Sequence, residues 1–563
     1  MNRLGSFEVH SVKKTREIKL KDLKSGINDL NNYIIKINQD NSIDYIIDKI
    51  CDHAGGKLIL KDSMAVCPMH EWKLNLNTLQ YNNSHECKRK LDYVLDDSET
   101  IHIEDTDNHL VNPYKGNKKG AVNLRWLNHA TVHVECNGVT LITDPWLFGP
   151  AFMTGWWLAT PSPKEGIELL KNADYVYVSH NHPDHLHAET LALLPKDKKI
   201  IIPDFKSKSC EKYLRKLHFT NITPLNFNDI FEIGPNIQVS ILKSGDFRDD
   251  SGLYVCANGH EFLFAVDCNF LNHHVLPQNI DLLLTAFAGG ASGFPLCFDN
   301  YTEAEKEAIL HRNTSAVKLS VINYLKATYP RYYLPYAGMF KEKSSRDAFI
   351  LSNNKKNSPQ HFESVAEKFG AGFIAPCSNQ IVSFTDGILS IREVETELLN
   401  EEDFNFYITT LKAEFSYEPG KIIDYLANSG FVDNQIVQII PTDDNFDQIV
   451  GEIVYADFKK QEFKTITRDA LTEHKEGYRV MQLKVRPEVF MCVITNSLPW
   501  EDFSIGFQMR IKRSPNEYES KFWYHFTNIY IGKENFRYSS FCGACTVVNQ
   551  NPIWATSYPS ILS

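Results

Sequence analysis

The sequence has no long hydrophobic run, because none of its apolar stretches approaches the roughly 18 residues that a membrane-spanning helix needs. Its first residues, MNRLGSFEVHSVKK, are too polar for the apolar core of a secretory signal. The 12 cysteines among 563 residues are an ordinary density and not that of a disulfide scaffold. We therefore expect a protein of the reducing cytoplasm, without a membrane span.

Basic charge is also scarce. The chain has 59 lysines and arginines against 70 acidic residues, a net charge of -11 and a pI near 6.0. Nonspecific binding of nucleic acid needs a net basic face, so we expect no nucleic acid as a partner. Core material is ample, since 43% of the residues are hydrophobic and 12% are aromatic, and this length suits roughly three or four domains.

The order of the segments predicts a multidomain α+β protein in three parts. Residues 1–112 contain short alternating segments such as KLILKD and ETIHIEDT, which are typical of a small β domain. Residues 120–392 alternate strand-like and helix-like segments, with an N-G turn at Asn137–Gly138, and predict a layered αββα sandwich. Residues 393–563 form a mixed α/β region that is rich in aromatic residues and contains no motif from which a mechanism follows.

Two Cys–His pairs in CDHAGGKLILKDSMAVCPMH form the first candidate site. Cys51 and His53 make one pair, and Cys67 and His70 make the other. Four such ligands suit a structural zinc ion. They also suit a Rieske [2Fe–2S] cluster, in which two thiolates bind one iron and two imidazoles bind the other, so that each loop supplies one of each. Both loops do so here, and we favour the Rieske cluster, which would carry single electrons to a second site.

The second candidate site follows the apolar strand YVYVS. The sequence SHNHPDHLHAET places His180, His182, Asp184 and His185 on one loop, a pattern similar to the His-x-His-x-Asp-His signature of the metallo-β-lactamase superfamily. This resemblance implies that the first two histidines bind one metal ion, and that Asp184 and His185 bind a second. We expect His187, the last histidine of the run, to lie on the surface.

The same resemblance implies further ligands. Asp267, after the strand FLFAV, lies where the superfamily places a bridging aspartate. The third ligand is expected within ILKSGDFRDD, which has no histidine; Asp246 is our candidate, and we expect Asp249 and Asp250 to face solvent. The two histidines of FLNHHVLP are candidates for the last ligand. Histidines and carboxylates with vacant positions fit non-haem iron as well as zinc.

Both sites together resemble CMP-N-acetylneuraminate hydroxylase, a family that joins a Rieske domain to a metallo-β-lactamase-like domain. Segments that look like that family are TDPWLFGPAFMTGWWLATPSP (143–163), TAFAGGASGFPL (285–296), LNHA around His129, YLPYAG, WEDFSIGFQMRIKRSPNEYESKFWYHF and CGACTVV. The resemblance spans nearly the whole chain and is strongest in residues 120–300. The family has a histidine near Asp246, and this departure leaves the third metal ligand open.

The resemblance implies an O₂-dependent monooxygenase that converts the N-acetyl methyl group of a CMP-linked sialic acid into a glycolyl group. It implies a [2Fe–2S] cluster and one or two non-haem irons as cofactors. It also implies an external electron donor, either a b-type cytochrome with its reductase or a ferredoxin-type system. No catalytic side chain is assigned, except that His129 is a candidate to line the metal pocket.

From the residues alone, other functions stay open. A fusion of a Rieske domain with a metallo-β-lactamase-like domain can act on a different small metabolite, for example by oxidising an amine. The chain can also be a metallohydrolase whose Rieske domain senses the redox state, or an electron carrier whose second metal site is vestigial. A requirement for O₂ and a reductant, with iron rather than zinc in the protein, would favour the oxygenase.

Overall fold

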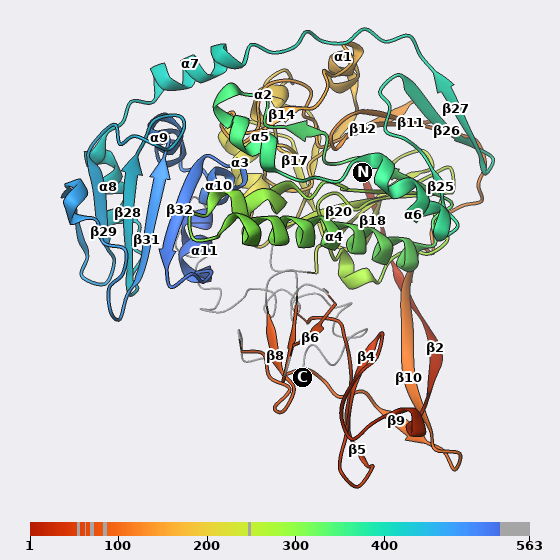
Figure 1. Ribbon diagram of the computed structural model, residues 1–563. Coiled ribbons are helices and arrows are strands. Elements are labelled where there is room, and N and C mark those ends of the chain that lie inside the picture. Colours follow the sequence, from red (N-terminus) through yellow and green to blue (C-terminus); the bar gives the residue numbers. More distant parts are fainter. Residues whose placement is uncertain (53–56, 62, 68–71, 83–86, 246–248, 530–563) are drawn as a thin grey trace.

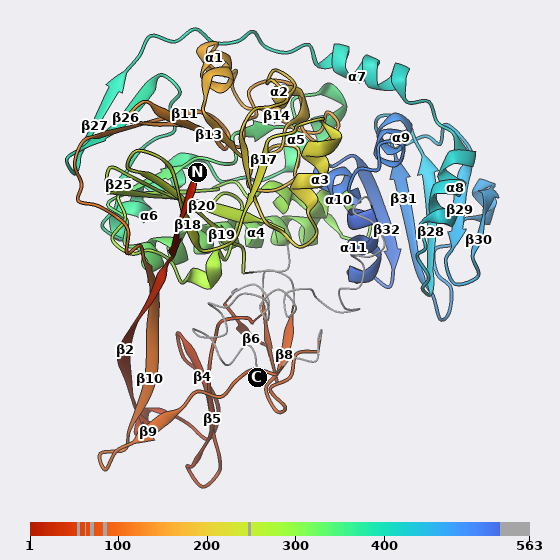
Figure 2. The same ribbon diagram turned by 180° about the vertical axis from the view of Figure 1, so that it is seen from behind.

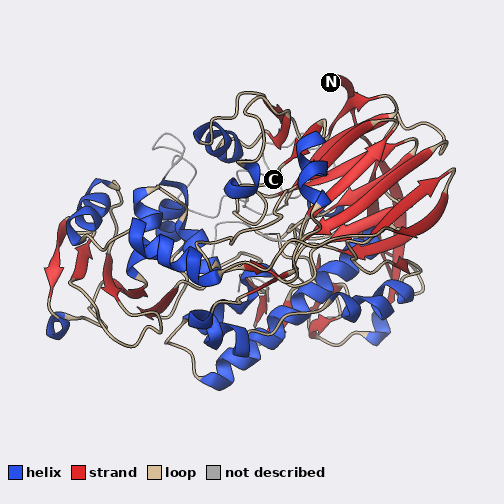
Figure 3. Cartoon of the chain, turned by 90° about the horizontal axis from the view of Figure 1, so that it is seen from above, coloured by secondary structure: helices blue, strands red, loops and turns tan. Residues whose placement is uncertain are grey.

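The computed structural model describes residues 1–52, 57–61, 63–67, 72–82, 87–245 and 249–529. Its centre is a sandwich of two sheets, each with eight strands (Figures 1 and 3). In sheet order, the strands of the first sheet are β1 (Asn2–Ser6), β18 (Asp229–Gly234), β19 (Ile237–Lys243), β20 (Ser251–Ala257), β21 (His260–Phe264), β22 (Leu282–Thr285), β23 (Tyr332–Pro335) and β25 (Gly372–Phe373). Those of the second are β17 (Ile222–Leu225), β16 (Ile200–Pro203), β15 (Tyr175–Tyr177), β13 (Val139–Thr143), β12 (Thr131–Cys136), β11 (Ala121–Asn128), β26 (Gln380–Thr385) and β27 (Ile388–Glu393).

Helices cover the outer face of each sheet. The connections of the second sheet contain α1 (Glu165–Asn172), α2 (Ala188–Leu191) and α3 (Ser209–Lys216). Those of the first sheet contain η2 (Asn272–His274), η3 (Gly290–Cys297), α4 (Glu303–Thr328), η4 (Ser345–Asp347), α5 (Ala348–Asn353), η5 (Pro359–Phe362) and α6 (Glu363–Lys368). The short strands β14 (Trp157–Leu158) and β24 (Phe340–Lys341) pair with each other beside the sandwich.

Three apolar clusters fill the spaces between these four layers. Successive side chains of a strand point to opposite faces of the sheet and so enter different clusters. Val255 of β20 packs between the sheets, whereas its neighbour Tyr254 packs toward α4. On the other side, Leu170 of α1 and Leu214 of α3 pack against the second sheet. This arrangement confirms the predicted αββα sandwich, and the N-G turn between β12 and β13 has the positive φ angles of a hairpin turn at both residues, 52° and 78°.

The N-terminal part extends from the sandwich on two long strands. The strands β2 (Glu8–Lys19) and β10 (Thr100–Val111) pair without interruption, and β9 (Tyr93–Leu95) joins them (Figures 1 and 2). η1 (Leu20–Asp22) follows β2, and two sheets of three strands complete this part: β3 (Gly26–Asp29), β4 (Tyr33–Ile37) and β5 (Ile43–Asp48); β6 (Ile59–Lys61), β7 (Met64–Val66) and β8 (Lys73–Asn75). In Figures 1 and 2, the sheet with β6 and β8 lies nearer to the sandwich than η1 and β9 do. The first strand, β1, nevertheless pairs with β18 at the edge of the sandwich. Residues 2–6 therefore belong to the sandwich, whereas the sequence predicted that they belong to the N-terminal domain of residues 1–112.

The C-terminal part has a sheet of five strands. In sheet order these are β30 (Glu462–Ile466), β29 (Ile453–Asp457), β28 (Gln435–Pro441), β31 (Arg479–Val485) and β32 (Met509–Ser514). Its other elements are α7 (Phe404–Glu414), α8 (Pro419–Asn428), η6 (Arg468–Ala470), α9 (Pro487–Thr495), α10 (Trp500–Ile505) and α11 (Ser520–Asn528). The segment after β27 passes over the top of the sandwich in Figure 1 and reaches this sheet through α7. Among the described residues, no helix combines the length and apolar character that crossing a membrane requires.

Candidate metal centre

Histidines and aspartates gather where strand ends of the two sheets meet. Asp144 follows β13, the run 180–185 follows β15, and His129 is in the turn between β11 and β12. From the other sheet, Asp250 directly precedes β20 and Asp267 follows β21. We call this group the histidine centre; its members are His129, Asp144, His180, His182, Asp184, His185, Asp250 and Asp267.

One set of ligand atoms surrounds His185. Its Nδ1 lies 3.2 Å from Oδ2 of Asp144, which assigns the ring proton to Nδ1. The other ring nitrogen, Nε2, faces Oδ2 of Asp184 and Oδ2 of Asp267, each at 3.4 Å. Among the described residues, neither this Nε2 nor Oδ1 of Asp184 has a hydrogen-bond partner, although both are buried. Because these buried atoms converge without hydrogen-bond partners, the residues fit a metal ion, which would bind their deprotonated forms.

A second set contains His180, His182 and Asp250. Oγ of Ser179 lies 2.9 Å from Nδ1 of His180, so Nε2 of that ring is the nitrogen that faces the site. This Nε2 lies 2.9 Å from Nδ1 of His182 and 3.8 Å from Oδ1 of Asp250. One ligand atom from each of the three residues lies within 4.8 Å of the others, which is close enough for all three to bind one ion.

Asp250 corrects one expectation from the sequence. It was expected to face solvent, but it is only 2% exposed. The N–H of Ser244 donates to the carbonyl of Asp250, which closes the loop at the start of β20 and turns the carboxylate inward. Asp249 is half-buried and bonds Ser207 instead. Asp246 lies outside the described residues and stays a prediction.

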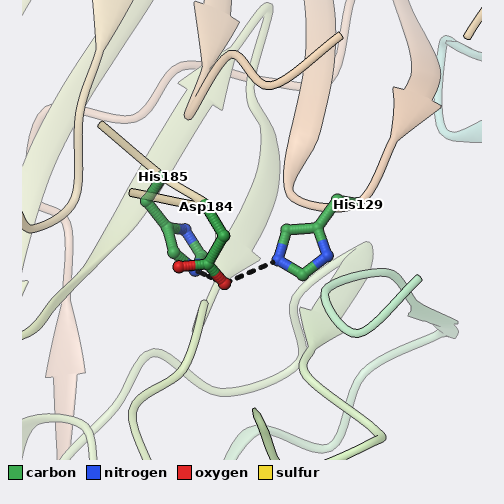
Figure 4. Close-up of side chains that lie close together, drawn as sticks. All are labelled: His129, Asp184 and His185. Atoms are coloured by element: carbon green, nitrogen blue, oxygen red, sulfur yellow. Dashed lines mark ion pairs between the residues drawn. The ribbon is translucent and has the colours of Figure 1, made fainter. Parts of the chain in front are cut away.

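His129 reaches the same centre from a different turn. Its Nδ1 accepts the N–H of Gly338 at 3.2 Å, so the ring proton lies on Nε2. Nε2 lies 3.2 Å from Oδ2 of Asp184, and Figure 4 shows the two side chains pointing toward each other beside His185. His129 therefore presents a proton rather than a lone pair to the centre, and it can hold the carboxylate of Asp184 but is poorly suited to bind a metal ion.

His187 is a second correction, because it is 3% exposed and does not lie on the surface. Its Nδ1 accepts the N–H of Thr190 at 3.1 Å and so caps α2, while Nε2 lies 3.2 Å from the carbonyl of Pro150. Burial lowers its pKa to about 4. The adjacent histidines His273 and His274 are in none of the groups of described residues that could hold a metal ion.

Charge in the centre is set by burial and by neighbouring groups. Burial lowers the pKa of His182, but the neighbouring Glu501, Asp250 and Asp502 together raise it to about 9. Burial raises the pKa of Asp184, but His185 and His129 together hold it well below its usual range. For Asp502, burial raises the pKa to about 8. A centre this rich in buried carboxylates favours multivalent cations.

Backbone strain is concentrated in the same turns. His129, Asp144 and Val266 have φ angles of 38°, 37° and 52°, in the left-handed region that residues with a Cβ rarely adopt. Val266 is β-branched, for which this conformation is most costly, and it directly precedes Asp267. Strain of this kind persists only where the surrounding structure fixes it, as in sites that hold ligands in place.

The N-terminal candidate site is described in part, since His53 and His70 lie outside the described residues. Cys51 and Cys67 are fully buried in one apolar cluster with Trp72. The N–H of Cys67 donates to the carbonyl of Trp72 at 2.8 Å, which brings the ends of the second ligand loop together. The two sulfur-bearing residues thus share one small core. We call this region, residues 26–95, the cysteine module.

Three residues of interest were missed in the sequence. Asp144 directly follows the buried strand VTLIT, and this position at a strand end was a usable signal. Asp250 was considered and rejected, because two adjacent aspartates give no indication of which one faces inward. Glu501 lies more than three hundred residues from the histidine motif, and no local pattern connects the two.

Comparison with known proteins gives a consistent result. Residues 123–259 match the Beta-lactamase superfamily domain, in agreement with the predicted fold of the central part. The chain is 31% identical over 567 residues to the cytidine monophosphate-N-acetylneuraminic acid hydroxylase of Danio rerio, covering 92% of this chain and 93% of that protein. It is 29% identical to the hydroxylase of Macaca mulatta over 558 residues, covering 90% and 92%. A similar solved structure is CmlA, a diiron β-hydroxylase from Streptomyces venezuelae, with a TM-score of 0.33 and 14% identity over 48% of this chain and 55% of that one.

Proposed function

The chain belongs to the cytidine monophosphate-N-acetylneuraminic acid hydroxylase family, and from this premise we propose that it hydroxylates the N-acetyl methyl group of CMP-N-acetylneuraminate. The similarity over nearly the full length of the chain carries this proposal. The reaction consumes O₂, two electrons and two protons, and it yields CMP-N-glycolylneuraminate and water. A methyl C–H bond beside an amide does not yield to acid–base catalysis, so a redox-active centre is required.

The histidine centre is the proposed place of this chemistry. His180, His182 and Asp250 would hold one iron, and Asp184, His185 and Asp267 a second. The buried ligand atoms around His185 that have no hydrogen-bond partner among the described residues support this assignment. When bound, iron supplies the oxygen activation that hydroxylation needs.

The surrounding side chains fix the ligands. Asp144 accepts from Nδ1 of His185 and so keeps Nε2 directed into the centre. Ser179 does the same for His180 through its hydroxyl group. His129 holds the proton on Nε2, from which it donates toward Asp184. Because Asp144, Ser179 and His129 are almost completely buried, water has little access to the ligands where these three residues contact them.

We further propose that the cysteine module holds a Rieske [2Fe–2S] cluster on Cys51, His53, Cys67 and His70. The burial of both cysteines in one apolar core supports this, because a low-dielectric environment tunes the potential of such a cluster. An external donor, a b-type cytochrome with its reductase or a ferredoxin-type system, would supply the electrons. A single zinc ion on the same four residues is the competing assignment.

Incubation with CMP-N-acetylneuraminate, a chemical reductant and ¹⁸O₂ tests the function. We expect a CMP-sialic acid whose glycolyl group contains one ¹⁸O atom, detected by mass spectrometry. Release of free CMP or acetate without ¹⁸O incorporation would instead indicate a hydrolase and contradict the proposal. Omission of the reductant is the control, and it should yield no labelled product.

A further inference from the structure

The histidine centre has a neighbour from the C-terminal part of the chain. We propose that α10 belongs to the metal centre and that Glu501 is a positioning residue, which accepts the Nε2–H of His182 and so directs Nδ1 of that ring to the metal ion. This inference rests on the metal centre of the proposed function. It assigns a role to a region for which the sequence offered none.

The two nitrogens of His182 have different surroundings. Nδ1 faces Nε2 of His180 at 2.9 Å, where both rings are aimed at the same point. A nitrogen that binds a metal ion must be unprotonated, so a neutral ring with Nδ1 as ligand has its proton on Nε2. Nε2 lies 4.0 Å from Oε2 of Glu501, which is an ion-pair distance and longer than a hydrogen bond. The Glu501 side chain is 39% exposed, so it has the freedom to close this gap by rotation about its own bonds.

The carboxylate is presented from a fixed base. Trp500 and Phe503 of α10 are fully buried in the apolar core of the C-terminal part. The end of the helix packs closely on the sandwich, since a Cβ added to Gly506 would lie 2.8 Å from the Cβ of Phe152. The Phe152 ring is in turn 6.1 Å from the His182 ring. The backbone of α10 is therefore held next to the metal ligand, and only the glutamate side chain needs to move.

Buried ion pairs also stabilise the contact between the C-terminal part and the sandwich. Nη1 of Arg486 donates to Asp347 at 2.6 Å and to Oε1 of Gln508, two residues beyond Gly506, at 2.8 Å. Arg346, next to Asp347 in η4, donates from Nη1 to Oε1 of Glu488 in α9 at 2.6 Å. These bonds join α9 and the segment after α10 to η4 of the sandwich. A helix held this way can act as part of the site rather than as a loose neighbour.

Asp502 adds an independent observation at the same place. It is 3% exposed, and among the described residues its Oδ1 has no hydrogen-bond partner. A carboxyl group in a purely structural position is normally satisfied within the protein. This oxygen of Asp502, which has no hydrogen-bond partner among the described residues, indicates that α10 faces a site that binds a ligand or a metal ion.

The test is a titration of the metal-free protein with Co²⁺ alone, followed by its visible d–d bands and by competition with a chromophoric chelator. Glu501→Ala should weaken the binding of one cobalt equivalent about 10–100-fold and shift its bands, because the ligand ring loses the group that orients it. Glu501→Gln should restore most of the affinity, since the amide oxygen can accept the same N–H. Glu476→Ala, which removes an exposed glutamate of the same region, is the matched control and should change nothing.

Equal cobalt affinity and identical bands in Glu501→Ala and the wild type would overturn the inference while leaving the proposed function intact. Failure of the wild type to bind cobalt would overturn the metal centre itself, and the inference with it. If Glu501→Ala does not fold, Glu501→Asp serves in its place. Its shorter side chain should weaken the same equivalent, and wild-type affinity in that variant would also overturn the inference.

Discussion

The cysteine module and the histidine centre differ in how their candidate ligands are held. The histidine centre takes its residues from the strand ends of two sheets of eight strands, and these residues converge from turns that are themselves strained. The cysteine module consists of sheets of three strands with two small apolar clusters, one of which contains both cysteines. A large scaffold can place ligands before a metal ion binds, whereas a small module must obtain part of its stability from the metal.

The largest effect should come from separating the two sites by mutation. His182→Ala should abolish product formation and leave the visible spectrum of the cluster intact, because the ligands of the cluster lie in another module. Cys67→Ser should abolish the cluster spectrum and multiple turnover but leave the iron of the histidine centre bound. Iron analysis, absorption spectra and product assays on both variants check this. Full turnover by Cys67→Ser would contradict the relay.

Removal of iron should destabilise the cysteine module more than the sandwich that carries the histidine centre. We expect the metal-free cysteine module to lose its resistance to proteolysis, since its core is too small to fold firmly without the cluster. The sandwich should stay resistant, because three apolar clusters hold its layers together. Mass spectrometry of the fragments locates the cuts. First cleavage within the sandwich, with residues 26–95 intact, would reverse the comparison.

The contact with the C-terminal part should depend on buried charge. Asp347→Ala should lower the free energy of unfolding by about 3–5 kcal/mol, because it leaves the buried Arg486 guanidinium without its carboxylate. Asp299→Ala is the matched control: its partner Lys484 is half-exposed, so the loss should be under about 1 kcal/mol. Denaturant unfolding measures both. Similar losses for the two variants would show that this contact is not held by buried charge.

The smallest of these effects concerns the third ligand. Asp250→Asn should weaken one metal equivalent by at least about 10–100-fold, the range known for groups around a metal site. Asp249→Asn should have little effect, because that carboxylate accepts from Ser207 and is in none of the groups of described residues that could hold a metal ion. Metal titration of both variants decides between them. Loss of metal in Asp249→Asn alone would show that the loop is differently arranged.

Features that depend on residues close together in the sequence could be predicted, and features that depend on contacts between distant segments could not. The motif His180 to His185 lies on one loop after one strand, so its convergence was readable, as was the layered fold from the alternation of strands and helices. Asp250 was misjudged because its direction depends on how the loop closes on β20. Asp144 was recognisable in part, from its position at the end of a buried strand. Glu501 reaches the centre only through the packing of separate elements, and no periodicity or spacing in the sequence encodes that contact.

The central claim is that electrons pass from the cysteine module to the histidine centre during hydroxylation. It is tested most directly by mixing the chemically reduced protein with O₂ and CMP-N-acetylneuraminate while the reduced-cluster EPR signal and the product are followed together. The account predicts that the signal disappears at the rate at which product forms, and that His182→Ala keeps its signal and forms no product. Product formation while the cluster of the wild type stays reduced would contradict it.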